Sequence, residues 1–174
     1  MKTKKYILGI FILFLFVFLV LNRPSLIGVS KNRIEKKARK SQKIEEEWSS
    51  VEYINDDIAA FIFYPEDLST HTFSIYRNRP GLSFGYFFIN GGGLPRISDG
   101  IEQINSSEGN ILLSLNKLKV SRIEVDNGLQ DIEEILIEDN KPFVVVLPEG
   151  SEKISFYDSD GKLISNDDIV VDSL

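Results

Sequence analysis

Cysteine is absent from this 174-residue sequence, and histidine occurs once, at position 71. Without cysteine the chain has no disulfides, thiolate metal sites, cysteine nucleophiles or lipid attachment through a lipoprotein cysteine. A single histidine disfavours a zinc site, because zinc usually draws several ligands from His and Cys. We therefore expect neither metal nor cofactor, and a fold stabilised by burial alone.

Acidic residues are almost missing from the first 43 positions, which hold eleven Lys or Arg and one acid (Glu35), for a net charge of +10. Residues 44–174 hold nine Lys or Arg and 25 Asp or Glu, for −16. We predict a basic tail at 1–5, a membrane anchor at 6–23, a basic helical stalk at 24–48 and an acidic all-β domain at 49–174. The acidic domain would repel phosphate backbones, so we expect no binding of nucleic acid.

Residues 6–21 carry no charge and are long enough to cross a bilayer. Sixteen helical residues rise about 24 Å, and Lys5 and Arg23 extend the span because their charged ends reach the headgroups. A cleaved signal peptide is the alternative, but the run has four Phe and no small-residue cleavage site. We expect an uncleaved single pass that contacts the bilayer through residues 6–23.

The orientation of this anchor depends on two positive flanks. Lys2, Lys4 and Lys5 adjoin the start of the apolar run, which favours a cytoplasmic tail and an extracytoplasmic domain. The basic residues after the run are more numerous but mostly more distant, so a cytoplasmic domain stays open.

Residues 30–48 contain no Pro or Gly and favour a helix. Their apolar positions Ile34, Ala38, Ile44 and Trp48 form a stripe too weak for a coiled coil. Seven basic side chains would contact lipid headgroups or, outside the cell, an anionic polymer: Lys31, Arg33, Lys36, Lys37, Arg39, Lys40 and Lys43. A solvated spacer is the alternative interpretation.

From Val51 onward, short β-rich runs alternate with turn residues, which predicts a β-sandwich of two packed sheets with an immunoglobulin-like or related topology. Residues 57–64 are apolar on both faces, as in a central strand. In 82–90 we expect Leu82, Phe84, Tyr86 and Phe88 on one face, and Gly85 at a bulge or close approach. Further strands are expected at 70–77, 110–116, 120–125, the second half of 129–137, 143–147, 153–157, 162–165 and 169–171.

Two short motifs invite a chemical interpretation. Asp158, Asp160 and Gly161 resemble part of a calcium loop, but the glycine comes too early, so we expect a hairpin turn. The glycines of 91–93 lack the Lys and Ser or Thr of a phosphate loop, which predicts a plain loop.

Acids are missing again from residues 68–98, although the rest of the domain is densely acidic. If a partner binds, we expect it there, because Arg and Tyr are enriched at interaction hot spots. The candidate residues are His71, Tyr76, Arg77, Arg79, Tyr86 and Arg96. The alternative is a central hairpin where packing disfavours acids.

The layout resembles that of small single-pass bacterial proteins with an extracytoplasmic β-domain. We expect a non-enzymatic binding or interaction module of the cell envelope, whose partner is an envelope protein or an anionic polymer. A membrane-anchored hydrolase using paired carboxylates and a cytoplasmic-facing regulatory domain are the alternatives.

Overall fold

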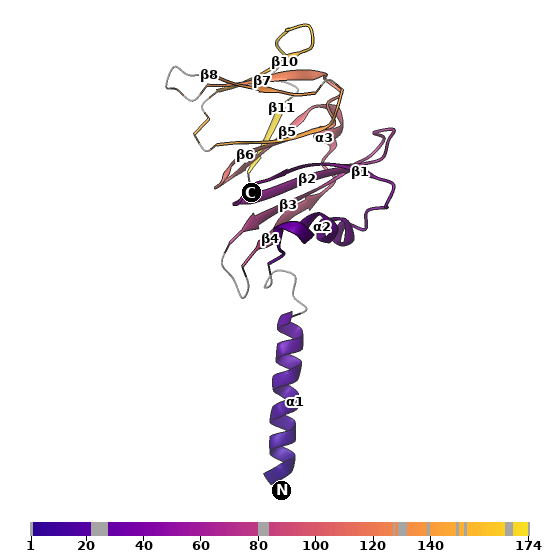
Figure 1. The fold of residues 1–174 in the computed structure, drawn as a ribbon, viewed down its shortest axis with the longest axis vertical. Helices are drawn as coiled ribbons and strands as arrows, with labels where there is room; N and C mark the ends of the chain where they lie inside the picture. Colours follow the sequence, from indigo (N-terminus) through magenta and orange to yellow (C-terminus); the bar gives the residue numbers. More distant parts are fainter. Residues whose placement is uncertain are drawn as a thin grey trace.

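The computed structural model describes residues 2–21, 28–79, 84–126, 128, 132–138, 140–148, 150–151, 153–165 and 169–173. Helix α1 (Lys2–Leu21) stands apart from the β-domain in Figure 1. Its side chains are described from Gly9 to Leu19, and those from Ile10 onward are large, apolar and 44–72% exposed. Among the residues that the structure describes, no helix has the length and apolar character needed to cross a membrane, so the predicted anchor stays a prediction.

The described strands form three sheets. Sheet A has the order β1 (Ser49–Ile54), β2 (Ile58–Tyr64), β3 (Thr72–Asn78), β4 (Tyr86–Gly92). Sheet B has the order β11 (Ile169–Ser173), β5 (Ile101–Ser106), β6 (Gly109–Ser114), β9 (Phe143–Leu147). Sheet C has the order β10 (Lys153–Asp158), β7 (Val120–Asp126), β8 (Ile132–Leu136). Neighbours pair antiparallel, except that β11 runs parallel to β5.

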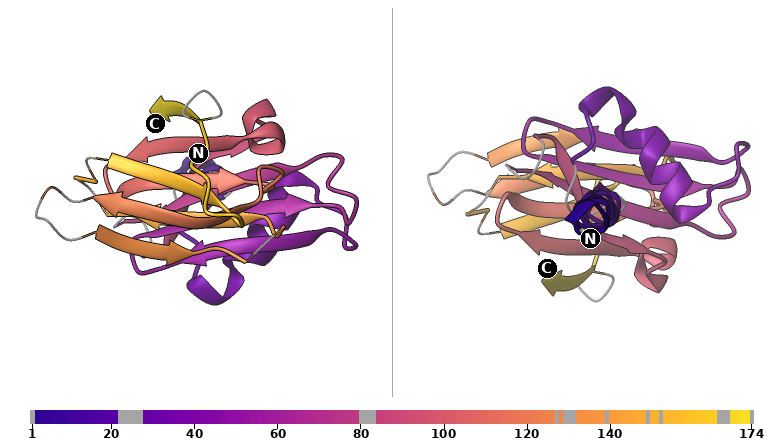
Figure 2. Two further views of the ribbon diagram at one scale, coloured as in Figure 1. Left: turned by 90° about the horizontal axis from the view of Figure 1, so that it is seen from above. Right: turned by 90° about the horizontal axis from the view of Figure 1, so that it is seen from below.

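The three sheets are stacked, with sheet B between the other two (Figure 1). Viewed along the stack, their strands run in roughly the same direction, which is the aligned mode of sheet packing (Figure 2). One core lies between sheets A and B and includes Ile62, Phe73 and Leu113. A second core lies between sheets B and C and includes Leu112 and Phe156.

Sheet B is buried on both faces because its strands are apolar at successive positions. In β6, Ile111 and Leu113 belong to the core shared with sheet A, whereas Leu112 between them belongs to the core shared with sheet C. The predicted all-β class and face-to-face packing of sheets are confirmed. The described strands nevertheless form three sheets instead of two, so the stack differs from an immunoglobulin-like pair.

The basic segment forms a short 3₁₀ helix, η1 (Lys31–Arg33), and then α2 (Ile34–Gln42). Helix α2 packs on the outer face of sheet A, where Ile34 and Ala38 are fully buried against side chains that include Phe61 and Tyr76. The part of the segment predicted as a stalk is therefore docked on the β-domain, because its weak apolar stripe faces an aromatic sheet surface.

Several local expectations change in the structure. Strands β1 and β5 and helix α3 (Pro95–Asp99) were not anticipated, and the predicted strand at 162–165 makes only one bridge, between Leu163 and Tyr157. The glycines of 91 and 92 belong to β4 and not to a loop. Residues 80–83 and 129–131 lie outside the described part, and so does Leu82 of the predicted aromatic face.

The predicted face of 82–90 is wrong for the residues described. Tyr86 and Phe87 are both buried, whereas Phe88 is 42% exposed. A register shift between Ile75 and Tyr76 where β3 pairs with β4 breaks the strict alternation. The close approach expected at Gly85 is confirmed: its φ is +131°, and a Cβ there would lie 2.7 Å from the Val29 carbonyl oxygen.

Candidate functional site

Arg39 fastens α2 to sheet A. Its guanidinium pairs with Glu35 at 2.9 Å, donates to the Trp48 carbonyl at 3.0 Å and to the Ser50 hydroxyl at 3.1 Å, and lies 5.0 Å from the centre of the Phe63 ring. Arg39 was one of the seven predicted lipid contacts. Its donors are engaged inside the domain, so the structure shows a structural role for this residue, and its contact with lipid stays a prediction.

A hollow lies between α2 and sheet A, and we call it the α2 groove. It has a volume of about 230 Å³ and is lined by Val29, Lys37, Ser41, Gln42, Tyr76, Tyr86 and Phe88. Val29, which forms one wall of the groove, is held in place by strand-like pairing with Tyr86. The backbone amides and carbonyls of these two residues exchange two hydrogen bonds of 2.8 Å.

The groove combines an aromatic floor with polar groups at its edge. Tyr76 and Phe88 contact each other edge to face, with ring centres 5.5 Å apart. The Tyr76 and Ser41 hydroxyls are 3.4 Å apart, and burial is the main cause that raises the pKa of Tyr76 above its usual value. Tyr76 thus stays a neutral hydroxyl that can donate, and Lys37 is exposed at the edge.

The structure brings two of the six predicted partner-binding residues together. Tyr76 and Tyr86 both line the α2 groove, although the Tyr86 hydroxyl already donates to the Asn55 carbonyl. Sequence reasoning missed Val29, Ser41, Gln42 and Phe88. The weak stripe of Ile34 and Ala38 was the signal that this helix covers part of a sheet.

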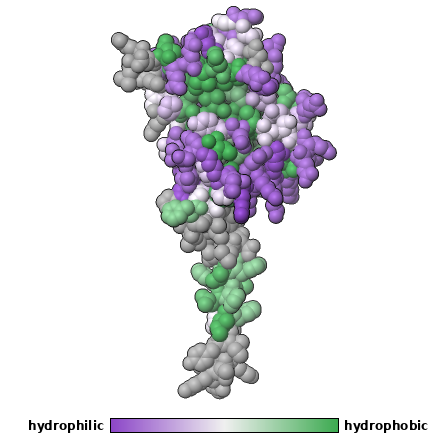
Figure 3. All heavy atoms as spheres, in the orientation of Figure 1, coloured by the Kyte–Doolittle hydropathy of each residue, from purple (hydrophilic) through white to green (hydrophobic). Residues whose placement is uncertain are grey.

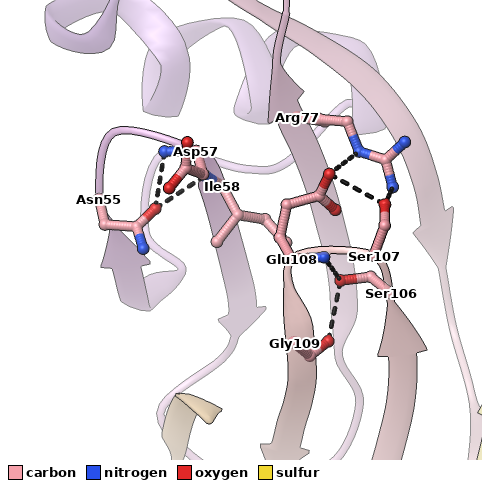
Figure 4. A network of polar contacts seen from close by, with 8 residues as sticks. All are labelled: Asn55, Asp57, Ile58, Arg77, Ser106, Ser107, Glu108 and Gly109. Atoms are coloured by element: carbon pink, nitrogen blue, oxygen red, sulfur yellow. Dashed lines mark hydrogen bonds and ion pairs between the residues drawn. The ribbon is translucent and has the colours of Figure 1, made fainter. Parts of the chain in front are cut away.

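Arg77 lies at the end of β3, outside the α2 groove. Its Nε pairs with Glu108 at 2.7 Å and a terminal nitrogen donates to the Ser107 hydroxyl at 2.7 Å (Figure 4). Because Ser107 and Glu108 form the turn between β5 and β6, these contacts link sheet A to sheet B. Arg77 therefore serves packing between sheets.

His71, another of the predicted partner-binding residues, is half-buried. Its Nε2 accepts the Leu94 backbone N–H at 3.2 Å, and its Nδ1 lies 3.0 Å from the Ser98 hydroxyl. Burial lowers the pKa of His71, which favours the neutral ring, so the single ring proton belongs on Nδ1 and is donated to Ser98. His71 cannot then accept the Ser98 proton as a base, and this pair fastens α3 to the end of the β2–β3 connection.

Arg79 and Arg96 are exposed at separate places. The Arg79 guanidinium lies 5.1 Å from the centre of the Phe87 ring beside β4, whereas Arg96 belongs to α3. Among the predicted lipid contacts, Lys31, Arg33, Lys36, Lys37, Lys40 and Lys43 are exposed. Figure 3 shows hydrophilic side chains over the lower part of the β-domain, where α2 lies.

The outer face of sheet C carries acidic side chains of the kind that the predicted hydrolase would use. Glu124 and Asp126 line a pocket of about 110 Å³ with Lys153 and Tyr157. Glu124 pairs with Arg122 at 3.2 Å, and that arginine also pairs with Glu134 at 3.2 Å. Arg122 thus offsets part of the negative charge of Glu124 and Glu134, and the hydrolase alternative stays a prediction. Within the described ranges, no three His, Cys, Asp or Glu side chains gather as metal ligands.

A second hollow opens where the edge strands β1, β8 and β9 meet. Its volume is about 420 Å³ and its lining is mainly apolar, with Tyr64, Ile135 and Val145 among the contributors. Glu138 and Lys141 at this hollow form an ion pair with each other. The hollow therefore offers apolar surface, but the charges of Glu138 and Lys141 are paired with each other and not directed at a ligand.

No family model matches the chain, and no curated protein or solved structure matches it.

Proposed function

We propose that the chain is a membrane-anchored binding module of the cell envelope whose ligand site is the α2 groove. In this proposal residues 6–23 cross the membrane, the β-domain lies outside the cytoplasm, and the groove holds a ligand that carries negative charge. The module performs no chemistry of its own.

The observation that carries the proposal is the composition of the groove. An aromatic floor of Tyr76 and Phe88 meets an ammonium group, two hydroxyls and an amide from Lys37, Ser41, Tyr76 and Gln42. Binding sites commonly pair apolar walls with a few polar groups that orient the ligand. Lys37 makes a negatively charged ligand the better match.

The anchor is supported by the uncharged run of residues 6–21 and by the exposed apolar side chains of α1. Phe14 and Phe16, near the middle of this run, are 72% and 64% exposed. Such a row of side chains is stable in contact with lipid and unfavourable in water. The lysines at the start of α1, ahead of the apolar run, support a cytoplasmic tail.

The experiment that tests the anchor is alkaline carbonate extraction of membranes from cells that express the full chain, followed by protease treatment of intact cells. We expect the chain to stay in the membrane pellet and the β-domain to be digested from outside. The matched variant Phe14→Arg/Phe16→Arg should be released, because each charge near a helix centre costs about 2.5–3.5 kcal/mol in a membrane. Release of the unaltered chain, or protection of its domain in intact cells, would contradict the proposal.

A further inference from the structure

The α2 groove lies close along the chain to the end of α1. Val29, which forms one wall, comes eight residues after Leu21, so a fully extended connection would span at most about 28 Å. The two hydrogen bonds between Val29 and Tyr86 fix that wall to β4. If α1 ends at a membrane surface, the groove is held within reach of the headgroups.

A large apolar side chain is exposed beside the same wall. Phe84, two residues before Tyr86, is 88% exposed. Arg79 donates its backbone N–H to the carbonyl of Gly85, the residue after Phe84, while its guanidinium lies over the buried Phe87 ring. An exposed aromatic ring next to a cation is typical of protein surfaces that rest at a membrane interface, where the ring enters the boundary and the cation meets phosphates.

Charge separates this side of the domain from the rest of it. Residues 44–174 carry −16, but Lys36, Lys37 and Lys40 of α2 are exposed, and Figure 1 places α2 on the side of the domain that faces α1. Each basic residue near an anionic bilayer contributes about 1 kcal/mol of attraction. The acidic remainder is repelled by the same surface, which favours one orientation of the domain.

The contents of the groove match a phosphate ester with an apolar continuation. Lys37 supplies the positive charge, and the Tyr76 hydroxyl can donate to a phosphate group, since its 3.4 Å contact with the Ser41 hydroxyl is long. The Ser41 hydroxyl itself donates to the Ala38 carbonyl at 2.9 Å and lies at the edge of the groove as a polar neighbour. Phe88 and Val29 supply apolar surface for the carbon chain beyond it. A volume of about 230 Å³ is smaller than a typical drug-sized pocket and suits a headgroup.

We propose that the α2 groove binds the headgroup of an anionic phospholipid of the membrane in which the chain is anchored, with Phe84 inserted at the interface. This inference rests on the proposed anchoring. A protein segment is the competing occupant. The lipid is favoured because the basic residues of α2 attract an anionic membrane, whereas the acidic remainder of the domain is repelled by it.

The test uses the purified full chain in a neutral detergent and native mass spectrometry with added phosphatidylglycerol or phosphatidylcholine. We expect phosphatidylglycerol adducts in preference to phosphatidylcholine adducts, and about five-fold weaker phosphatidylglycerol binding in Lys37→Gln. Lys162→Gln removes the same charge at an exposed position of the β10 turn, far along the chain from α2, and should bind as the unaltered chain does. Equal loss in both variants would overturn the assignment to the groove.

Two further experiments distinguish a lipid headgroup from free phosphate, and lipid binding from membrane anchoring. Inorganic phosphate at the same concentration should not displace phosphatidylglycerol; displacement would mean a general anion site and would overturn the lipid assignment. In vesicles, the full chain should resist carbonate extraction whether the lipid is anionic or zwitterionic. A chain that resists extraction but shows no preference for phosphatidylglycerol refutes the lipid inference alone, whereas an extractable chain refutes the anchor.

Discussion

Replacing Arg39 should loosen α2 from the β-domain and thereby open the α2 groove. The guanidinium is the common partner of Glu35, the Trp48 carbonyl and the Ser50 hydroxyl, and it lies over the Phe63 ring. Arg39→Met keeps most of the apolar stem and removes these four contacts together.

The size of the effect follows from the exposure of each contact. The Arg39 side chain is 25% exposed and Glu35 is 43% exposed, so their ion pair is worth at most about 1 kcal/mol. The hydrogen bonds to Trp48 and Ser50 add about 1 kcal/mol each, and the contact with Phe63 adds about 0.5–1 kcal/mol. We expect the free energy of unfolding to fall by about 2–3 kcal/mol, because contacts of one side chain are not fully additive.

The assay is urea unfolding of the full chain in detergent, combined with hydrogen exchange of the α2 amides. Lys40→Met, on the exposed side of the same helix, is the matched control and should change the free energy of unfolding by less than about 0.5 kcal/mol. Arg39→Met should also speed exchange in α2 more than in β2. Equal stability of the two variants, with unchanged exchange in α2, would refute the role given to Arg39.

Three other predictions test the stack of sheets, the close approach of Gly85 to Val29, and His71. Phe156→Ala should cost about 3–5 kcal/mol in urea unfolding because its ring fills the core between sheets B and C, whereas Ile132→Ala, 62% exposed on sheet C, should cost little; similar values would contradict the third layer. Gly85→Ala should lower the melting temperature more than Gly161→Ala: both have positive φ, but only at Gly85 would the new Cβ meet a backbone oxygen. Burial holds the folded pKa of His71 below its unfolded value of 6.5, so its contribution to stability is complete above that pH and is lost as pH falls through the folded pKa; urea midpoints measured from pH 7.5 to 5 should show this loss, and His71→Gln should show less of it.

Much of the fold could be predicted from the sequence because some strands carry a local signal. Residues 57–64 are apolar at successive positions, and β2 is indeed buried on both faces. The turn at Asp158 is also confirmed, since the Asp158 carboxylate accepts the backbone N–H groups of Asp160 and Lys162 and Gly161 has a φ of +76°. In both cases the cause lies within a few neighbouring residues.

The third sheet and the groove depend on contacts distant in sequence. In β6, the alternation of Ile111 and Leu113 indicated one buried face, but only the packing of sheet C shows why Leu112 is buried as well. The glycine at 91 suggested a loop, yet a Cβ there would lie 2.7 Å from the Phe73 carbonyl oxygen and from the Gln42 side chain. Such close approaches between strands and helices leave no periodic signal.

Residues of the candidate site were predicted from the sequence, but in two separate parts of the chain. Tyr76 and Tyr86 were expected in a partner-binding window of the domain, and Lys37 was expected in a separate stalk. Docking of Ile34 and Ala38 on sheet A brings these residues to one hollow. Both tyrosines are correspondingly buried, with Tyr76 2% and Tyr86 3% exposed.

The pairing of Val29 with Tyr86 also determines how the molecule would carry mechanical load. Tension applied through α1 would arrive first at the two hydrogen bonds that join Val29 to the beginning of β4, and only then at η1 and α2. These two hydrogen bonds are fewer than those of the ladder between β3 and β4, so Val29 would separate from β4 while the three sheets stay intact. A pull on the chain would therefore remove the Val29 side of the α2 groove before it unfolds the domain.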